Sequence, residues 1–183
     1  MTSEASPAIK AVRAIDKFSD AVGTCVSFLA VPLVFGVSYE VFARYAFNRP
    51  TVWAFDLTYM LYGCLFMLGS AYALLKGAHI RTDFFWEKFP PRRKGLIDTV
   101  AYIVFFFPSL AVFLWISGHE AWVAFDIGET SEQTAWRPAL WPMKAAISLS
   151  ALLLLIQGVS ELLKSWHLWQ TGDELEHREK IDI

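Results

Sequence analysis

The chain has 183 residues, of which 55% are hydrophobic, 16% aromatic and 19% charged, and its mean hydropathy is +0.39. A soluble domain has about 45 to 50% apolar and about 25% charged residues, so this composition indicates a membrane protein instead. The 16 Lys and Arg nearly balance the 18 Asp and Glu, which leaves no basic surface for nucleic acid. Two Cys and four His, without a hydrolase or nucleotide-binding motif, give no sign of a disulfide scaffold or an enzyme site.

Residues 1–20 are expected to form an amphipathic helix in the headgroup layer of the cytoplasmic leaflet. Ser6 and Pro7 suit the N-cap and the first helical position, and Lys10, Arg13 and Lys17 share one arc of the helix opposite an apolar arc. The alternative is that this segment extends the first span. The first apolar run has no small-residue cleavage site, so it is expected to remain as an anchor.

Four long uncharged stretches follow. A helix needs about 20 apolar residues to cross the hydrocarbon core, and the stretches predict spans at about 21–41, 54–75, 96–118 and 142–163. These form a predicted four-helix membrane domain, residues 21–165, followed by a cytoplasmic polar tail, residues 166–183. Pro32 and Pro108 are expected to kink the first and third spans without ending them. The third span is expected to continue to Asp126 and to end before Gly128.

The distribution of Lys and Arg predicts an orientation. Twelve of the 16 fall before the first span, between the second and third spans, or after the fourth, and four fall on the other side. Because cytoplasmic loops carry the excess of Lys and Arg, both termini are predicted to be cytoplasmic. The fold class is therefore predicted to be an all-α integral membrane protein with four transmembrane helices and an N-terminal interfacial helix.

The loops have compositions typical of the membrane surface. Aromatic and basic residues in the first loop and aromatic residues in the third suit a headgroup layer, and the third loop carries many acidic residues and few basic ones. The second loop, residues 76–94, is predicted to be an irregular interfacial crossing, in which Pro90 and Pro91 end any helix and the basic residues 92–94 contact anionic lipid.

Two other functions fit the residues less well. A membrane cytochrome needs facing His ligands, but His79 and His119 are predicted on opposite sides of the membrane. A stand-alone four-helix exporter needs a carboxylate at mid-depth, and the spans have carboxylates only at their ends, where they are expected to be hydrated: Glu40, Asp56, Asp98 and Glu161. Neither a cofactor nor a metal is expected, and the surplus of Phe and Trp favours a helical partner.

Two expectations concern individual side chains. A carboxylate one turn inside a span is costly unless it is paired, and the topology places Asp56 near Arg44, so these two are expected to pair. Cys25 and Cys64 are expected at depths about 10 Å apart at 1.5 Å per residue. That separation exceeds the roughly 7 Å limit between the Cα atoms of a disulfide, so both are expected to remain thiols.

Short motifs along residues 40–165 resemble the small membrane subunit of tripartite ATP-independent periplasmic (TRAP) transporters, in the branch usually labelled mannitol/chloroaromatic. The first half of the resemblance lies in Arg44-Tyr45-Ala46-Phe47 with Pro50 and Trp53, in Gly69-Ser70-Ala71-Tyr72, and in His79-Ile80-Arg81-Thr82-Asp83. The second half lies in Gly128-Glu129-Thr130-Ser131, in Trp136 with Pro138, and in Trp141-Pro142-Met143-Lys144. Asp56 stands where the family more often has Glu.

The resemblance implies a non-catalytic scaffold subunit of a sodium-driven importer of organic anions in a bacterial inner membrane. Its implied partners are a large membrane subunit, which would hold the substrate and sodium sites, and a periplasmic substrate-binding protein, with membrane lipid around them. The residues expected to serve structure or docking are Arg44, Arg49, Trp53, Asp56, His79, Arg81, Asp83, Glu129, Ser131, Trp141 and Lys144.

Overall fold

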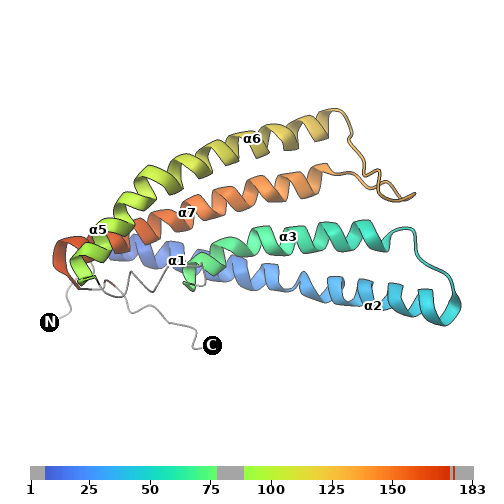
Figure 1. The fold of residues 1–183 in the computed structure, drawn as a ribbon, viewed down its shortest axis with the longest axis horizontal. Helices are drawn as coiled ribbons and strands as arrows, with labels where there is room; N and C mark the ends of the chain where they lie inside the picture. Colours follow the sequence, from blue (N-terminus) through green and yellow to red (C-terminus); the bar gives the residue numbers. More distant parts are fainter. Residues whose placement is uncertain (1–6, 78–88, 174, 176–183) are drawn as a thin grey trace. The chain divides into compact units, whose positions relative to one another are not determined.

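The computed structural model describes residues 7–77, 89–173 and 175, and these ranges are almost entirely helical (Figure 1). The α-helices are α1 (Pro7–Ser27), α2 (Ala30–Phe47), α3 (Ala54–Leu75), α5 (Pro91–Ala101), α6 (Phe107–Asp126) and α7 (Trp141–Thr171). A π-helical turn, η1 (Tyr102–Phe106), joins α5 to α6. The described part contains no strand, only an isolated antiparallel bridge between Thr130 and Ala139.

Four helical stretches are long and apolar enough to cross a membrane: Pro7–Phe47, Ala54–Leu75, Pro91–Asp126 and Trp141–Thr171. The predicted all-α, four-span fold class is therefore confirmed. The second span has the predicted bounds, and the other three continue as helix beyond theirs. The fourth stretch is the most enclosed by the rest of the protein. In its most apolar 18 residues, 39% of the residues are buried, compared with 6% in the first stretch.

The first span contains a break near its proline. Helix α1 runs through Asp20 without interruption and ends at Ser27, and α2 begins at Ala30. Pro32 has no N–H to donate to the carbonyl of Phe28, four residues earlier, so the helix is interrupted there. The absence of a break at Asp20 favours the alternative in which the N-terminal segment extends the first span. A position in the headgroup layer stays a prediction.

Two prolines affect the helical geometry of the third span: Pro91 at its start and Pro108 near the π turn. Pro91 is the first residue of α5, so the basic residues 92–94 lie in a helix, and the expectation that Pro90 and Pro91 only end helices is wrong. A proline at the first helical position loses no helical hydrogen bond, because its N–H would be unpaired there anyway. The π turn η1 ends two residues before Pro108, and Phe107, which lies between them, donates its N–H to the carbonyl of Tyr102. Helix α6 ends at Asp126 as predicted, and Gly128 follows with φ +63°.

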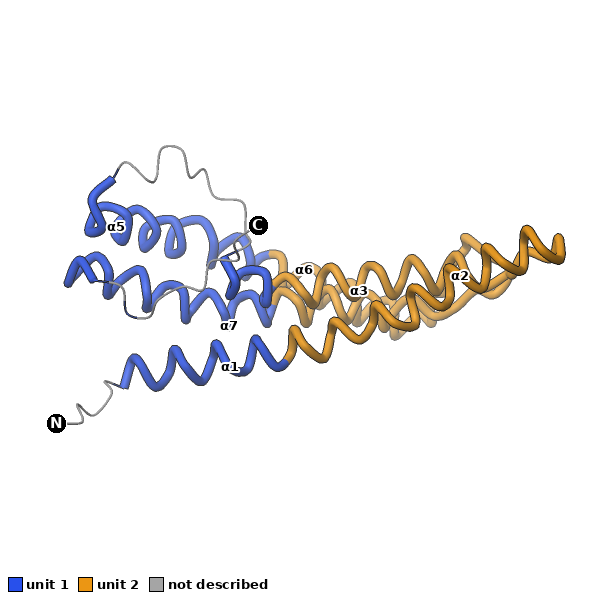
Figure 2. The backbone as a smooth tube through the Cα atoms, turned by 90° about the horizontal axis from the view of Figure 1, so that it is seen from below, with its two compact units in different colours: residues 1–21, 71–112, 152–183 blue, residues 22–70, 113–151 orange. Residues whose placement is uncertain are grey.

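The described chain divides into two compact units (Figure 2). Of the described residues, unit 1 comprises 7–21, 71–77, 89–112, 152–173 and 175, and in it α5 approaches the end of α7 closely. A Cβ atom added at Gly95 would lie 2.7 Å from the carbonyl oxygen of Ser165 and 2.9 Å from the Cα atom of Trp169. Only a glycine fits this crossing.

Unit 2 comprises residues 22–70 and 113–151. In it α2 lies beside α3, with Gly36 in ordinary contact distance of Leu57, and α3 packs on the start of α7, where Gly63 faces the side chain of Met143. The segment 127–140, which joins α6 to α7, belongs to this unit together with the α2–α3 loop.

Candidate functional site

Asp56 is the buried centre of the loop end of unit 2. It lies in the first turn of α3 with 2% of its surface exposed. Its carboxylate accepts a hydrogen bond of 2.6 Å from the hydroxyl of Ser131 and another from the hydroxyl of Thr134. A buried carboxylate is costly unless its oxygens are hydrogen-bonded, and the N-terminal end of a helix favours negative charge. The two bonds therefore hold the 127–140 segment against the start of α3.

The 127–140 segment is also closed by its own backbone. Ser131 donates its N–H to the carbonyl of Pro138 at 2.8 Å, and Leu140 donates to the carbonyl of Glu129 at 3.0 Å. The amide N–H of Gln133 donates to the hydroxyl of Ser131 at 3.2 Å, so this hydroxyl is bonded on both sides. The segment is consequently a defined loop with a fixed presentation of its exposed side chains.

Lys144 ties the same loop to α6 and α7. Its Nζ atom lies 2.6 Å from a carboxylate oxygen of Glu129 and 3.6 Å from one of Glu120. The lysine comes from the first turn of α7, Glu129 from the loop and Glu120 from α6. The sequence named Glu129 and Lys144 as separate candidates, and the structure brings them together.

Arg44 and Glu40 form an intrahelical ion pair on α2, with Nη2 at 2.5 Å from Oε1. Glu40 also accepts from the backbone N–H of Thr51 at 2.8 Å and from its hydroxyl, which closes the α2–α3 loop. The expected pair of Arg44 with Asp56 is therefore wrong. Glu40 lies one helical turn from Arg44 and is the nearer carboxylate, and two hydroxyls already bind Asp56.

The other candidates of this end are surface residues. The ring of Trp53 stacks on that of Tyr39, with centroids 6.0 Å apart and an interplanar angle of 19°. Trp141 meets Phe125 edge to face, with centroids 5.6 Å apart. Arg49 is exposed at the end of α2. These side chains present aromatic and basic groups next to the Asp56 and Lys144 contacts within unit 2.

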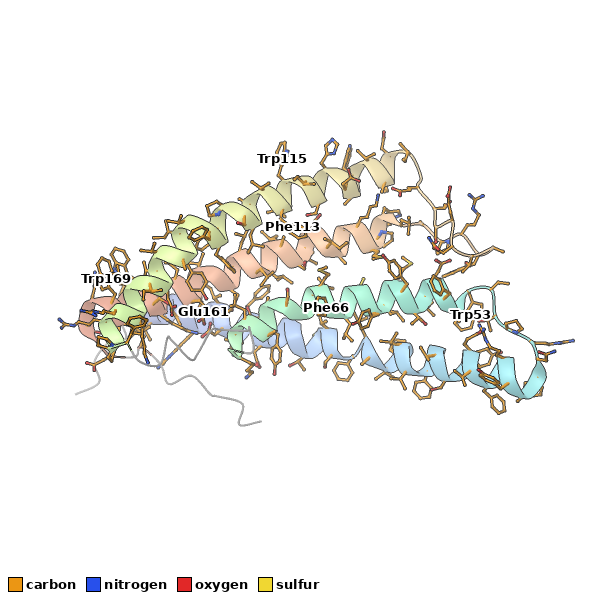
Figure 3. All side chains as sticks on the ribbon, in the orientation of Figure 1. Trp53, Phe66, Phe113, Trp115, Glu161 and Trp169 are labelled. Carbon is orange, nitrogen blue, oxygen red and sulfur yellow. The ribbon has the colours of Figure 1, made fainter. Side chains whose placement is uncertain are left out.

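A second polar cluster lies in unit 1, between α1 and α7. Asp16 accepts hydrogen bonds from the Nε2 atom of Gln157 at 3.0 Å and from the hydroxyl of Ser160 at 2.6 Å. Lys164 lies 2.6 Å from Asp16 and 3.0 Å from Glu161, which has 1% of its surface exposed (Figure 3). The cluster joins residues more than 140 positions apart in the sequence.

The expectation that carboxylates at span ends are hydrated is therefore wrong for Asp56 and Glu161, both of which are buried inside the protein. The sequence does contain a signal for the second cluster. Gln157, Ser160, Glu161 and Lys164 recur at helical spacing on one side of an otherwise apolar span. Their partner on α1, Asp16, could not be recognised in the same way. It lies in a segment with several charged residues, whose sequence is equally compatible with exposure to solvent.

The remaining predictions concern other parts of the chain. His79, Arg81 and Asp83 lie outside the described residues. Within the described ranges, no group of three or more His, Cys, Asp or Glu side chains is placed to hold a metal ion. Cys25 and Cys64 are both free thiols.

Comparison with known proteins gives one match. The family described as tripartite ATP-independent periplasmic transporters, DctQ component, matches residues 33–168, which include both loop networks of unit 2. Comparisons with curated proteins and with solved structures gave no match. DctQ components work with DctM and DctP components in these transporters. Because the match covers most of the sequence and the four apolar helices agree with it, the chain belongs to the DctQ family and is the small membrane subunit of a TRAP transporter, a multi-pass protein of the inner membrane.

Proposed function

We propose that this subunit is the non-catalytic scaffold of a sodium-driven importer of organic anions, chiefly carboxylates, in a bacterial inner membrane. The observation that supports the scaffold role is the set of hydrogen bonds made by the Asp56 carboxylate. Each oxygen of its carboxylate accepts a hydrogen bond from a hydroxyl of the neighbouring loop and the side chain is buried, which supports a structural role for Asp56 over binding of a sodium ion or a substrate. Substrate and coupling ions then belong to the large membrane subunit.

We further propose that both termini and residues 76–95 are cytoplasmic, while the 127–140 loop and the α2–α3 loop are periplasmic. The support is the excess of Lys and Arg on the side of the termini. In this orientation the Asp56 network and the Lys144 pairs lie at the outer end of the helices, where the periplasmic binding protein arrives.

The outer loops are the proposed docking surface for that binding protein. Trp136 is 47% exposed on the 127–140 loop, beside the exposed side chains of Glu132, Gln133 and Arg137. The loop is fixed by the hydrogen bond from Ser131 to Asp56 and by the ion pair between Glu129 and Lys144. A loop held in this way loses little conformational entropy when a partner binds, which favours docking.

Reconstitution into proteoliposomes tests the function. The chain, its large membrane subunit and the binding protein are combined, and carboxylates that stabilise the binding protein against heat are supplied as radiolabelled probes. We expect uptake only with all three proteins and an inwardly directed sodium gradient. Uptake by this chain alone, or uptake that persists without sodium, contradicts the proposal.

Cysteine labelling in intact cells tests the orientation. In a Cys25→Ser, Cys64→Ser background, Thr130→Cys is expected to react with an impermeant maleimide and Arg93→Cys to be protected. Both positions are exposed side chains, whereas a side chain at Gly95 collides with α7 and makes a poor reporter. Protection at position 130 together with labelling at position 93 means that the orientation is reversed.

A further inference from the structure

Helix α3 presents a row of exposed aromatic side chains within unit 2. Phe55, Tyr59, Tyr62 and Phe66 follow one another at helical spacing and are 60%, 54%, 60% and 66% exposed. The rings of Tyr62 and Phe66 stack, with centroids 6.5 Å apart and an interplanar angle of 21° (Phe66 is labelled in Figure 3). We call these four residues the α3 aromatic row.

Tyr62 puts its hydroxyl group at a depth where lipid offers nothing to bond it. Tyr62 is eight residues after the first residue of α3, which places it about 12 Å from the start and about 20 Å from the end of the helix. Within the described residues, neither Tyr59 nor Tyr62 makes a side-chain hydrogen bond. Tyrosine hydroxyls removed from water almost always have a hydrogen-bond partner, so hydrocarbon is a poor neighbour for this face.

The other helices present different faces at mid-depth. The large exposed side chains in the middle of the first span are apolar: Phe28 in the break between α1 and α2, and Val31, Val34 and Phe35 on α2. On α6, Phe113 is exposed, and Trp115, with 78% exposure, lies within about 8 Å along the helix of the exposed carboxylate of Glu120, so its indole N–H can reach polar surroundings (Figure 3). These faces suit lipid, whereas the α3 aromatic row does not.

The next turn of α3 is suited to the close approach of another helix. A Cβ atom added at Gly69, one turn beyond Phe66 on α3, would meet no atom within 4 Å. Helices in membranes associate through small residues that let backbones approach and through hydrogen bonds between helices, because lipid and apolar side chains are equally apolar. The open space at Gly69 and the two hydroxyls supply both kinds of contact on one face.

We infer that the α3 aromatic row, with Gly69, is the surface by which this subunit binds the large membrane subunit, and that helix backbone carbonyls or polar side chains of that subunit accept hydrogen bonds from Tyr59 and Tyr62. The inference rests on the proposed function for its partner. A second copy of this chain and lipid are the other occupants that the experiment separates.

Photocrosslinking in the assembled transporter tests the position of the surface. Tyr62 is replaced by benzoylphenylalanine, the chain is expressed with its large membrane subunit and binding protein, and membranes are irradiated. We expect a crosslinked product whose mass is the sum of this chain and the large subunit. The matched control is the same replacement at Phe35 of α2, which is 71% exposed and is expected to give no protein product.

Removal of the hydroxyls tests the hydrogen bonds. The variants Tyr59→Phe and Tyr62→Phe are each expected to lower the co-purified large subunit about threefold under partial dissociation in detergent, the usual effect of one hydrogen bond between membrane helices. Tyr45→Phe, which changes an exposed tyrosine in the last turn of α2, is expected to change nothing.

The outcomes separate the inference from the proposed function. A product of twice the mass of this chain identifies a second copy on the surface, and the absence of a protein product at Tyr62 identifies lipid. Equal crosslinking at Tyr62 and Phe35 also overturns the inference. In all three cases, co-purification of the unchanged chain with the large subunit leaves the proposed function standing, whereas loss of that co-purification removes the proposed function itself.

Discussion

Asp56 shows how a buried carboxylate is accommodated in this protein without a cation. Two hydroxyls and a helix N-terminus stabilise its charge, while Arg44 is engaged by Glu40 on its own helix. The hydroxyls belong to a loop 75 and 78 residues later in the chain. The residue that was expected to make an ion pair therefore fixes the relation between α3 and the 127–140 loop.

A double-mutant cycle measures this arrangement. Asp56→Ala is expected to lower the free energy of unfolding in mixed micelles by about 2 kcal/mol, because two hydroxyls lose a charged acceptor. The coupling energy between Asp56→Ala and Ser131→Ala is expected to be about 1 kcal/mol or more, since the two residues share one hydrogen bond. Asp56→Ala and Arg44→Ala serve as the control pair and are expected to be additive; a coupling confined to that pair contradicts the structure.

Two ion pairs in unit 1, Lys164 with Asp16 and Lys76 with Asp20, differ in burial and are expected to differ in their effect on stability. Lys164 and Asp16 are 12% and 18% exposed, and removal of one partner from such a pair leaves an uncompensated charge. Lys164→Ala is therefore expected to lower the free energy of unfolding by about 3 kcal/mol.

Lys76 pairs with Asp20 at 3.3 Å, but Asp20 is 51% exposed, so Asp20→Ala is expected to cost less than about 1 kcal/mol. Urea- or detergent-induced unfolding of the two variants compares them directly. Equal losses show that the buried cluster contributes no more than a surface pair.

At the scale of whole elements, prolines place the irregularities of the helices. Pro32 and Pro108 each follow a departure from α-helical geometry, a break between α1 and α2 in one case and the π turn η1 in the other. In both cases the proline withholds its N–H from a carbonyl in the preceding turn. Each span continues beyond its irregularity as helix.

Glycines determine how closely the helices cross. Alanine substitutions at two of them, Gly95 and Gly36, are expected to have opposite effects on stability. Gly95→Ala is expected to lower the free energy of unfolding by about 1 to 3 kcal/mol, because the added methyl group collides with the backbone of α7, which cannot move aside as a side chain can.

Gly36→Ala is the matched control. Its added methyl group meets only a Leu57 carbon at 3.8 Å, and alanine favours helix over glycine by about 1 kcal/mol. Thermal unfolding of the two purified variants is expected to show a lower midpoint for the first and an unchanged or higher midpoint for the second. A lower midpoint for Gly36→Ala contradicts the spacing between α2 and α3.

At the scale of the whole transporter, the loop end of unit 2 is expected to act on the binding protein. Trp136→Ala is expected to raise the binding-protein concentration needed for half-maximal uptake roughly tenfold, because exposed tryptophans are frequent energetic centres of interfaces. The amount of assembled membrane complex is expected to stay the same.

Trp122→Ala, which removes another exposed indole from α6, is the control and is expected to leave uptake unchanged. Uptake is measured in proteoliposomes at increasing concentrations of binding protein. If the maximal rate falls and the half-saturating concentration stays constant, the loop is not a docking surface.

Hydropathy, prolines and glycines in the sequence were sufficient for the four spans, the bounds of α3 and the end of α6 at Asp126, because these depend on local composition and on backbone geometry within a few residues. The side-chain partners were not accessible in this way. Asp56 accepts hydrogen bonds from Ser131 and Thr134, and Asp16 accepts them from Gln157 and Ser160. In each case the partners are 75 or more residues apart in the sequence. Periodicity along one helix shows which positions are polar, whereas only the packing of helices against one another decides which polar groups meet, and therefore which carboxylates are buried and which stay exposed.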